Sequence, residues 1–262
     1  MGKLNGKSAI VLGAAGAGNM GQVIAQRFAQ EGAKVLAAGR HEDELNRLAT
    51  ELNGAAAVCD ITSRADIDAM FAKCADAFGG VDIAVNAAGW GLLAPFVETS
   101  EDDLEKMTAL QFKGPFQFMQ AAVSAMGENG GSIIQISSAT ATIMLENHAA
   151  YMGTKAGVDH VVRCVANEFG KYGVRANSIS PGLTATPMTA AAMAAPGLED
   201  VFKKEYPLGR IGTSDDIAAA AVFLASDECF MTGQNLQVNG GLTLRRNPTQ
   251  AEMEAAIAKA AG

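Results

Sequence analysis

Strand-like runs alternate with amphipathic stretches along this chain, and that alternation constrains its fold more than any other feature. The short apolar runs are residues 8–12, 34–38, 55–59, 83–86, 132–137, 175–180 and 235–238. Amphipathic stretches at residues 23–30, 42–52 and 67–78 separate the first of these runs. Strands that are apolar almost throughout predict a parallel sheet covered by helices on both faces. We therefore expect an α/β fold.

A single domain of residues 1–262 fits this pattern. Of the 262 residues, 49% are apolar, and no linker-like change of composition divides the chain. Residues 184–206 are rich in Ala and Met, and we expect them to form a mobile lid. Residues 245–262 read as a polar turn followed by an Ala-rich helix, a C-terminal extension. One further helix has apolar residues at i, i+3, i+4, i+7 and i+11, which predicts one face against the sheet; they are Val158, Val161, Val162, Val165 and Phe169.

Charge and cysteine usage exclude several classes of function. Twenty Lys and Arg against 28 Asp and Glu give a net charge of −8, without a basic block, so we expect no nucleic-acid partner. No apolar run approaches about 18 residues, and residues 1–7 do not resemble a secretion or lipidation signal, so we expect no membrane anchor. The four cysteines are scattered without a Cys-x-x-Cys pair. A reduced, cytoplasmic protein without a metal site is expected.

A glycine-rich loop joins the first expected strand to the first expected helix. It contains Gly13 and then Gly16-x-Gly18-x-x-Gly21. Glycines in this position let the backbone turn tightly, and the following helix N-terminus attracts the pyrophosphate of a dinucleotide. The alternative is a turn of small residues. Placement at the head of a β-α-β unit favours the dinucleotide.

The end of the second strand indicates which dinucleotide is preferred. Instead of an acidic residue that would accept from a ribose 2′-hydroxyl, the chain has Gly39 and Arg40. A guanidinium binds a 2′-phosphate, so Arg40 favours NADP(H) over NAD(H). Alternatively, Arg40 is a solvated surface charge and NAD(H) is used. The glycine loop contains no second basic residue.

Three side chains form a candidate catalytic group. Tyr151 and Lys155 are four residues apart, which places a phenol and an ammonium on the same helix face, one turn apart. A nearby cation lowers the pKa of a tyrosine and makes it a better acid-base catalyst. Ser138 follows a strand, at the edge where open parallel sheets bind ligands. Taken alone, the Tyr-Lys pair could equally be a helix-surface pair.

These residues and their order identify a family. The sequence resembles the short-chain dehydrogenase/reductases over residues 7–241. The resemblance rests on residues 13–21, 59–61, 85–89, 136–138, 151–155, 175–182, 232–234 and 238–241. It implies a Rossmann-type doubly wound sheet of seven parallel strands. It also implies a homotetramer, assembled through the helices around residues 100–120 and 151–169 and through the last strand.

The resemblance also implies residue roles. Tyr151 would give a proton to the carbonyl oxygen or take one from the alcohol, Ser138 would hydrogen-bond that oxygen, and Lys155 would bind the nicotinamide ribose and lower the pKa of Tyr151. Asp60 and Ile61 would contact the adenine. The other expected cofactor contacts are Gly13, Gly16, Gly18, Met20, Gly21, Asn86, Ala88, Gly89, Pro181, Gly182 and Thr186.

The chain departs from the family pattern at a few positions. Gln111 stands where the family has a fourth catalytic residue, an Asn, and its extra methylene could shift a water-mediated proton path from Lys155. The glycine loop is one residue longer than usual, with Leu12 in place of a Thr. Ala87 replaces a second Asn. Ser138, Tyr151 and Lys155 are all retained.

The side chains in the loops that follow the strand ends indicate the class of substrate. They supply an apolar wall that suits a hydrophobic ketone or secondary alcohol: Trp90, Leu92, Leu93, Ile143, Met144, Leu145, Met188 and Met193. Several of these could instead pack inside the lid, and His148 is expected to be a surface residue.

Two alternative functions are considered. A 3-oxoacyl-thioester reductase would need a basic patch for its carrier, and Lys203 with Lys204 offers a weak one. A non-catalytic dinucleotide sensor would be expected to lack Tyr151 or Lys155. An enoyl reductase would space Tyr and Lys more widely, and a halohydrin-lyase-like relative would have Arg at position 155.

Overall fold

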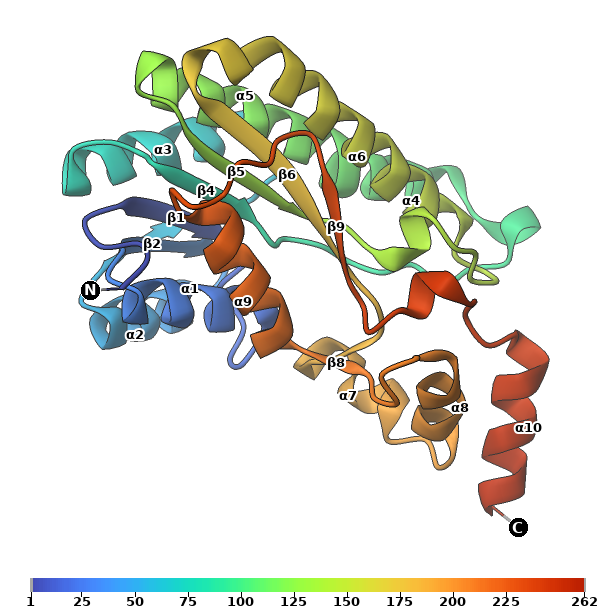
Figure 1. Ribbon diagram of the computed structural model, residues 1–262. Helices are drawn as coiled ribbons and strands as arrows, with labels where there is room; N and C mark the ends of the chain where they lie inside the picture. The colour runs from blue at the N-terminus through green and yellow to red at the C-terminus, as the bar shows by residue number, and fades with distance from the viewer. Residues whose placement is uncertain (1, 262) are drawn as a thin grey trace.

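The computed structural model describes residues 2–261, apart from the side chains of Ala191, Ala192 and Ala261 (Figure 1). Met1 and Gly262, the ends of the expected domain, lie outside this range. The main strands are β1 (Ser8–Leu12), β2 (Lys34–Gly39), β3 (Ala55–Val58), β4 (Ile83–Asn86), β5 (Gly131–Ile136), β6 (Val174–Pro181) and β9 (Asn235–Val238). The helices are α1 (Met20–Gln30), α2 (Glu42–Leu52), α3 (Arg64–Phe78), α4 (Glu101–Thr108), α5 (Gly114–Met126), α6 (Ala149–Phe169), α7 (Pro187–Met193), α8 (Leu198–Glu205), α9 (Ser214–Ala225) and α10 (Gln250–Ala261).

The seven strands form one parallel sheet in the order β3-β2-β1-β4-β5-β6-β9. The predicted Rossmann-type doubly wound fold is confirmed. The chain builds outward from β1 in one direction and from β4 in the other, so the strand order reverses between these two neighbours. Open sheets of this kind bind ligands beyond the strand carboxyl ends at that reversal.

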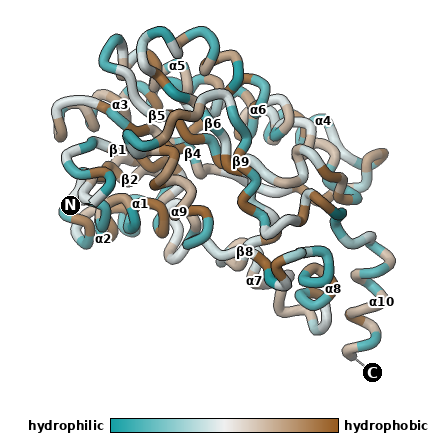
Figure 2. Tube along the Cα trace, in the orientation of Figure 1, coloured by the Kyte–Doolittle hydropathy of each residue, from teal (hydrophilic) through white to brown (hydrophobic). Residues whose placement is uncertain are grey.

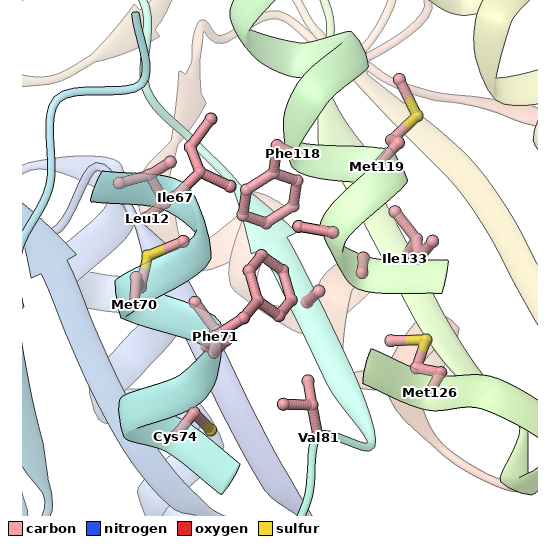
Figure 3. Packing of buried hydrophobic residues seen from close by; sticks show 14 of the residues in the cluster. Leu12, Ile67, Met70, Phe71, Cys74, Val81, Phe118, Met119, Met126 and Ile133 are labelled. Carbon is pink, nitrogen blue, oxygen red and sulfur yellow. The ribbon is translucent and has the colours of Figure 1, made fainter. Parts of the chain in front are cut away.

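Helices cover both faces of the sheet, as the apolar strands require. In Figure 1, α3, α5 and α6 lie over one face and α1, α2 and α9 over the other. Each layer has its own buried cluster, and Figure 2 shows apolar segments concentrated along the sheet between the more polar outer surfaces of the helices. Figure 3 shows part of the first cluster, in which the rings of Phe71 and Phe118 meet edge to face with centroids 5.3 Å apart.

The helix that carries the candidate Tyr-Lys pair, α6, packs as its apolar stripe predicts. Val158, Val162 and Val165 are buried, and Val161 and Phe169 are partly buried against the same cluster. Before it, α4 runs into α5 through one π-helical stretch, Ala109–Lys113, which the sequence did not predict. Such stretches are often found at functional sites.

The segment expected to be a mobile lid contains regular structure. Strand β7 (Thr184–Ala185) pairs with β8 (Gly212–Thr213), and α7 and α8 follow β7. A small apolar cluster holds this region together; its buried members are Ala139, Leu198, Phe202, Tyr206, Ile211 and Leu242. The predicted C-terminal helix is present as α10. It packs on α8 at the side of the molecule, away from the sheet (Figure 1).

Among the helices between residues 2 and 261, none has the length and hydropathy needed to cross a bilayer.

Candidate active site

The glycine loop lies between β1 and α1 and leaves almost no space for side chains at two of its glycines. Gly13 has a φ of +99°, and a Cβ there would lie 2.6 Å from the Ala87 carbonyl carbon. A Cβ at Gly21 would lie 2.4 Å from the oxygen of Gly13, so α1 can approach β1 only with glycine. At Gly16 the nearest atom is the flexible Asn19 amide, 2.8 Å from such a Cβ. The loop is therefore a close backbone cradle.

The first turn of α1 provides donors for an anion. Asn19 caps the helix by accepting from the amide of Gln22 (2.9 Å). The amides of Met20 and Gly21 have no protein partner within residues 2–261. The Gly18 amide differs, because it donates to Oε1 of Gln22 (3.0 Å). Free amides at a helix N-terminus favour a phosphate, so this cradle fits a dinucleotide.

Arg40 and Asp60 follow neighbouring strands at the same sheet edge. Arg40 is exposed and forms no ion pair within the described chain. The Asp60 carboxylate accepts from the Thr62 amide (2.9 Å), and this hydrogen bond, with a smaller contribution from the Arg40 charge, lowers the pKa of Asp60. Ile61 is buried, and its carbonyl lies against Gly114, where a Cβ would be 2.7 Å away.

His41, next to Arg40, also contacts the glycine loop. Its Nδ1 hydrogen-bonds with the oxygen of Ala15 (3.0 Å). The sequence analysis did not identify His41, since no spacing rule links it to the loop.

The Asn86 side chain holds the loop that follows β4 in place. Its Nδ2 donates to Oε1 of Gln135 (2.9 Å), and its Oδ1 accepts from the Ala88 amide (3.1 Å). Gln135 in turn donates to the Ile136 carbonyl (2.9 Å). The Asn86 side chain therefore fixes the loop through Ala88 and Gly89, and only the loop itself reaches the open edge of the sheet.

Ser138 and Tyr151 are brought together by the end of β5 and the start of α6. The Ser138 hydroxyl hydrogen-bonds with that of Thr140 (2.9 Å) and accepts from the Thr140 amide (3.2 Å). Burial raises the pKa of Tyr151, and the neighbouring Ser138 hydroxyl partly offsets this increase. A phenol in this environment holds its proton at neutral pH.

Lys155 lies one turn after Tyr151 and is buried. Its Nζ donates to the oxygen of Ile136 (2.9 Å) and lies 5.5 Å from the centroid of the Tyr151 ring. Burial lowers the pKa of Lys155 to about 8, and the Asp159 carboxylate opposes this shift. Lys155 was expected to lower the pKa of Tyr151. In the structure that pKa is raised, because loss of water around the phenol has the larger effect.

Gln111 lies in the middle of the π-helical stretch and is 1% exposed. Its Nε2 donates to the oxygen of Trp90 (2.8 Å), while its Oε1 is buried without a partner within the described residues. A Cβ at Gly89 would lie 3.5 Å from both amide atoms of Gln111 and 3.9 Å from Nζ of Lys155. The structure thus places the Gln111 amide near Lys155.

The remaining predicted cofactor contacts follow β6. Pro181 ends the strand and is buried. A Cβ at Gly182 would lie 2.3 Å from Oη of Tyr206, which the sequence analysis did not single out. Thr186 hydrogen-bonds with Thr189 at the start of α7 (3.2 Å), so it belongs to the lid rather than to the Ser138–Tyr151 group.

The expected substrate wall divides into two parts. Leu93, Met144 and Met188 are about 70% exposed (70%, 69% and 70%). Ile143 and Met193 instead pack against the lid cluster. The prediction that His148 is a surface residue is wrong. Its ring is half-buried and lies against Tyr151, with centroids 4.6 Å apart.

Comparisons with known proteins agree with this architecture. A family model described as Enoyl-(Acyl carrier protein) reductase matches residues 13–243. D-threitol dehydrogenase from Mycolicibacterium smegmatis is 38% identical over 93% of this chain and 95% of its own. Trans-4-hydroxycyclohexanecarboxylate dehydrogenase from Sinomonas cyclohexanicum is 36% identical over 93% of this chain and 95% of its own.

A solved structure gives the same result. A gluconate 5-dehydrogenase from Burkholderia cenocepacia, in complex with NADP and tartrate, superposes with a TM-score of 0.88 at 30% identity, covering 93% of this chain and 97% of that one. The chain belongs to the short-chain dehydrogenase/reductase family. It is an NAD(P)-dependent oxidoreductase that acts on an alcohol or ketone, and the alternative of a non-catalytic dinucleotide sensor is set aside.

Proposed function

We propose that this short-chain dehydrogenase/reductase transfers a hydride between NADP(H) and a hydrophobic ketone or secondary alcohol, with Tyr151 as the general acid and base. One observation carries the proposal: Ser138, Tyr151 and Lys155 come together although they come from separate elements. The loop after β4 joins them to the glycine cradle, because it lies against Gly13 at Ala87 and approaches Lys155 at Gly89. The cradle fits the pyrophosphate of the cofactor because a Cβ at Gly13 or Gly21 would clash with backbone atoms.

The bound cofactor supplies or accepts the hydride, and side chains of the protein donate or accept the proton. In reduction, the Ser138 hydroxyl donates to the substrate carbonyl oxygen and holds it near the Tyr151 phenol. As the carbonyl carbon gains the hydride, Tyr151 gives its proton to the oxygen, and the product is the alcohol. A raised pKa keeps Tyr151 protonated at neutral pH and therefore favours the reductive direction.

Lys155 has two roles in this proposal. Its ammonium hydrogen-bonds the nicotinamide ribose, and its charge stabilises the phenolate that Tyr151 becomes after proton transfer. Both roles require the protonated amine. With a pKa of about 8, Lys155 loses its charge over a physiologically accessible pH range.

The preference for NADP(H) rests on Arg40. Its guanidinium is exposed at the end of β2, free of ion pairs within the described chain, and close enough to Asp60 to lower the pKa of that carboxyl. A 2′-phosphate on the adenosine ribose would be drawn to this charge.

The exposed apolar side chains of Leu93, Met144 and Met188, on segments that follow strand ends, support a hydrophobic substrate, including a cyclic one. The relative from Sinomonas cyclohexanicum is named for a cyclohexane substrate, whereas the one from Mycolicibacterium smegmatis is named for a polyol. The alternative, a 3-oxoacyl-thioester reductase, is less well supported. Lys203, half of its expected basic patch, pairs with Glu199 (2.8 Å).

We also propose a homotetramer built through the surface of α4 to α6 and through β9. Two apolar side chains on the first part of that surface, Leu104 and Phe116, are 47% and 43% exposed in the single chain. Sedimentation velocity measures the mass of the assembly directly. A monomer at micromolar concentration would contradict this arrangement.

The central test replaces Tyr151 with Phe. We expect turnover of a panel of cyclic and aromatic ketones with NADPH to fall at least about 100-fold, because an acid-base group of this kind contributes about 10²-fold or more. NADPH binding, followed by its fluorescence, should be retained. Residual turnover above about one tenth of the wild-type rate would contradict the assignment.

A further inference from the structure

Three consecutive residues at the end of β5 contact three successive turns of α6. The pairs are Ile136 with Lys155, Ser137 with Asp159, and Ser138 with Tyr151. The helix residues are spaced four apart, which places them on one face, and all three strand-end residues lie at or just after the last residue of β5, Ile136. The outer two pairs belong to the group proposed above. The middle pair, which involves Asp159, has no role yet.

Asp159 is held by polar contacts from two strands. Its Oδ2 accepts from the Ser137 hydroxyl (2.9 Å) and from the amide of Asn235 on the edge strand β9. Its Oδ1 is buried without a hydrogen-bond partner within the described residues, as is the nearby hydroxyl of Ser178. A carboxylate in this position costs free energy through lost hydration, so its retention calls for an explanation beyond packing.

Few charged groups among the described residues act on Lys155. Asp159, one turn further along α6, is the single charged group that opposes the loss of protonation at Lys155. The other groups facing Nζ are the Tyr151 ring, the Ile136 carbonyl and the neutral amide of Gln111. Burial raises the pKa of Asp159 itself, and the hydroxyls of Ser178 and Ser137 oppose that increase. Among the described residues, Lys155 provides the charge that also opposes it.

We propose that Asp159 is a positioning residue for the catalytic group: its carboxylate keeps the buried Lys155 protonated and, through Ser137, holds the end of β5 against α6. The inference deepens the proposed function, since it relies on Lys155 binding the cofactor as an ammonium. Opposite charges one helical turn apart stabilise each other more where burial reduces screening by water; Lys155 is buried, and Oδ1 of the partly buried Asp159 is shielded from solvent.

The protonation state of Lys155 links this proposal to a measurable quantity. Above the pKa of Lys155 the amine no longer carries the charge needed to bind the ribose, so cofactor affinity falls. Because the wild-type pKa is about 8, the decrease should centre near that pH. Removal of the Asp159 charge lowers the pKa of Lys155 further and moves the decrease to a lower pH.

The test follows NADPH binding by fluorescence from about pH 6 to about pH 10 in the wild type and in Asp159→Asn. Asn keeps an oxygen that accepts from Ser137 but has no charge. We expect the midpoint of the decrease to move down by about one pH unit, a typical effect of one nearby charge. At about pH 8 the dissociation constant should rise several-fold, up to about tenfold. At the acid end of the range the two proteins should differ by less than about twofold.

Three further variants make the result decisive. Glu168→Gln removes an exposed acid from the same helix, nine residues after Asp159, and should leave the midpoint unchanged. Lys155→Met should abolish the decrease; if the decrease persists, Lys155 is not the titrating group and the proposal is wrong. Ser137→Ala removes a hydrogen bond that lowers the pKa of Asp159, so it should give a smaller shift in the same direction. It provides the test if Asp159→Asn does not fold.

An unshifted midpoint in Asp159→Asn, with a native thermal transition, would overturn the inference. Ketone turnover is measured separately. The two proposals can fail separately. If the binding midpoint depends on Lys155 and moves in Asp159→Asn, the inference is supported. If the same wild-type protein turns over no ketone, the proposed function is contradicted.

Discussion

The amide of Gln111 offers a sharp test of how protons reach the site. Its Oε1 is buried without a partner within residues 2–261, near Nζ of Lys155, while its Nε2 donates to the carbonyl of Trp90. Such an oxygen is expected to accept from an ordered water, since an unpaired buried acceptor costs about 1–3 kcal/mol. We predict that this water carries protons between Lys155 and the solvent.

Two substitutions separate this role from packing. Gln111→Leu keeps the volume but cannot hold the water, and Gln111→Asn keeps the amide on a shorter side chain. The stability of the Leu variant should change by less than about 1.5 kcal/mol, because the hydrogen bond to the Trp90 carbonyl contributes about 1 kcal/mol and the side-chain volume is kept. An altered rate in that variant therefore cannot be assigned to unfolding.

The assay is kcat with saturating NADPH at two pH values, alongside thermal unfolding of each variant. We expect Gln111→Asn to remain within about tenfold of the wild type and Gln111→Leu to lose more than about tenfold, since proton transfer by positioned groups contributes about 10²–10⁴ in total. A Leu variant at the wild-type rate would refute the relay. It would also show that Gln111 only packs beneath Trp90.

Two other predictions concern the cofactor cradle. Arg40→Asp should shift the preference from NADPH toward NADH, because a carboxylate repels a 2′-phosphate and accepts from a 2′-hydroxyl; a wild type that already prefers NADH tenfold in kcat/KM, about 1.4 kcal/mol, would remove Arg40 from this role. Gly13→Ala should destabilise the protein by about 1–3 kcal/mol and weaken NADPH binding, because φ is +99° and the new Cβ would lie 2.6 Å from the Ala87 carbonyl carbon. Gly80→Ala is its control, since a Cβ there has nothing within 4 Å, and equal melting temperatures for the two variants would contradict the argument.

The sheet was predictable because each strand has its own apolar run. The expected strand at residues 8–12 and the one at residues 235–238 agree with β1 and β9 to the residue. Helix α1 begins at Met20, three residues before the apolar pattern starts, because the Asn19 cap determines the first turn. Capping of this kind depends on side-chain hydrogen bonds that periodicity does not record.

The lid and the π-helical stretch were not predictable in the same way. Helices α7 and α8 pack on each other and on a small separate cluster, and α8 also packs on α10, so their apolar residues follow no stripe that faces the seven-stranded sheet. The π-helical stretch at Ala109–Lys113 has an ordinary composition. It inserts Gln111 toward Trp90, a contact between residues 21 positions apart in sequence. Non-local contacts of this type become visible only in three dimensions.

Within the candidate site, sequence motifs identified the residues proposed for catalysis and cofactor binding but not the residues that contact them from behind. Tyr151 and Lys155 were found because their spacing places them on one helix face. Asp159 continues the same four-residue spacing. In the sequence, however, an acidic residue next to the apolar stripe of α6 looks like an ordinary solvent-exposed side chain. Its partner, Ser137, follows β5 and lies 22 residues away in sequence.

Polar residues at the ends of two neighbouring strands, β4 and β5, form a continuous buried network on the α6 side of the sheet. It runs from Asn86 through Gln135 to the Ile136 carbonyl, which also accepts from Lys155. A core of this kind is less stable than an apolar one unless nearly every donor and acceptor is paired. Here pairing is nearly complete, and the unpaired oxygens of Gln111 and Asp159 both lie near Lys155. Two of the buried oxygens that lack a partner among the described residues thus lie near the buried ammonium of Lys155, where the proposed proton transfer needs water and charge.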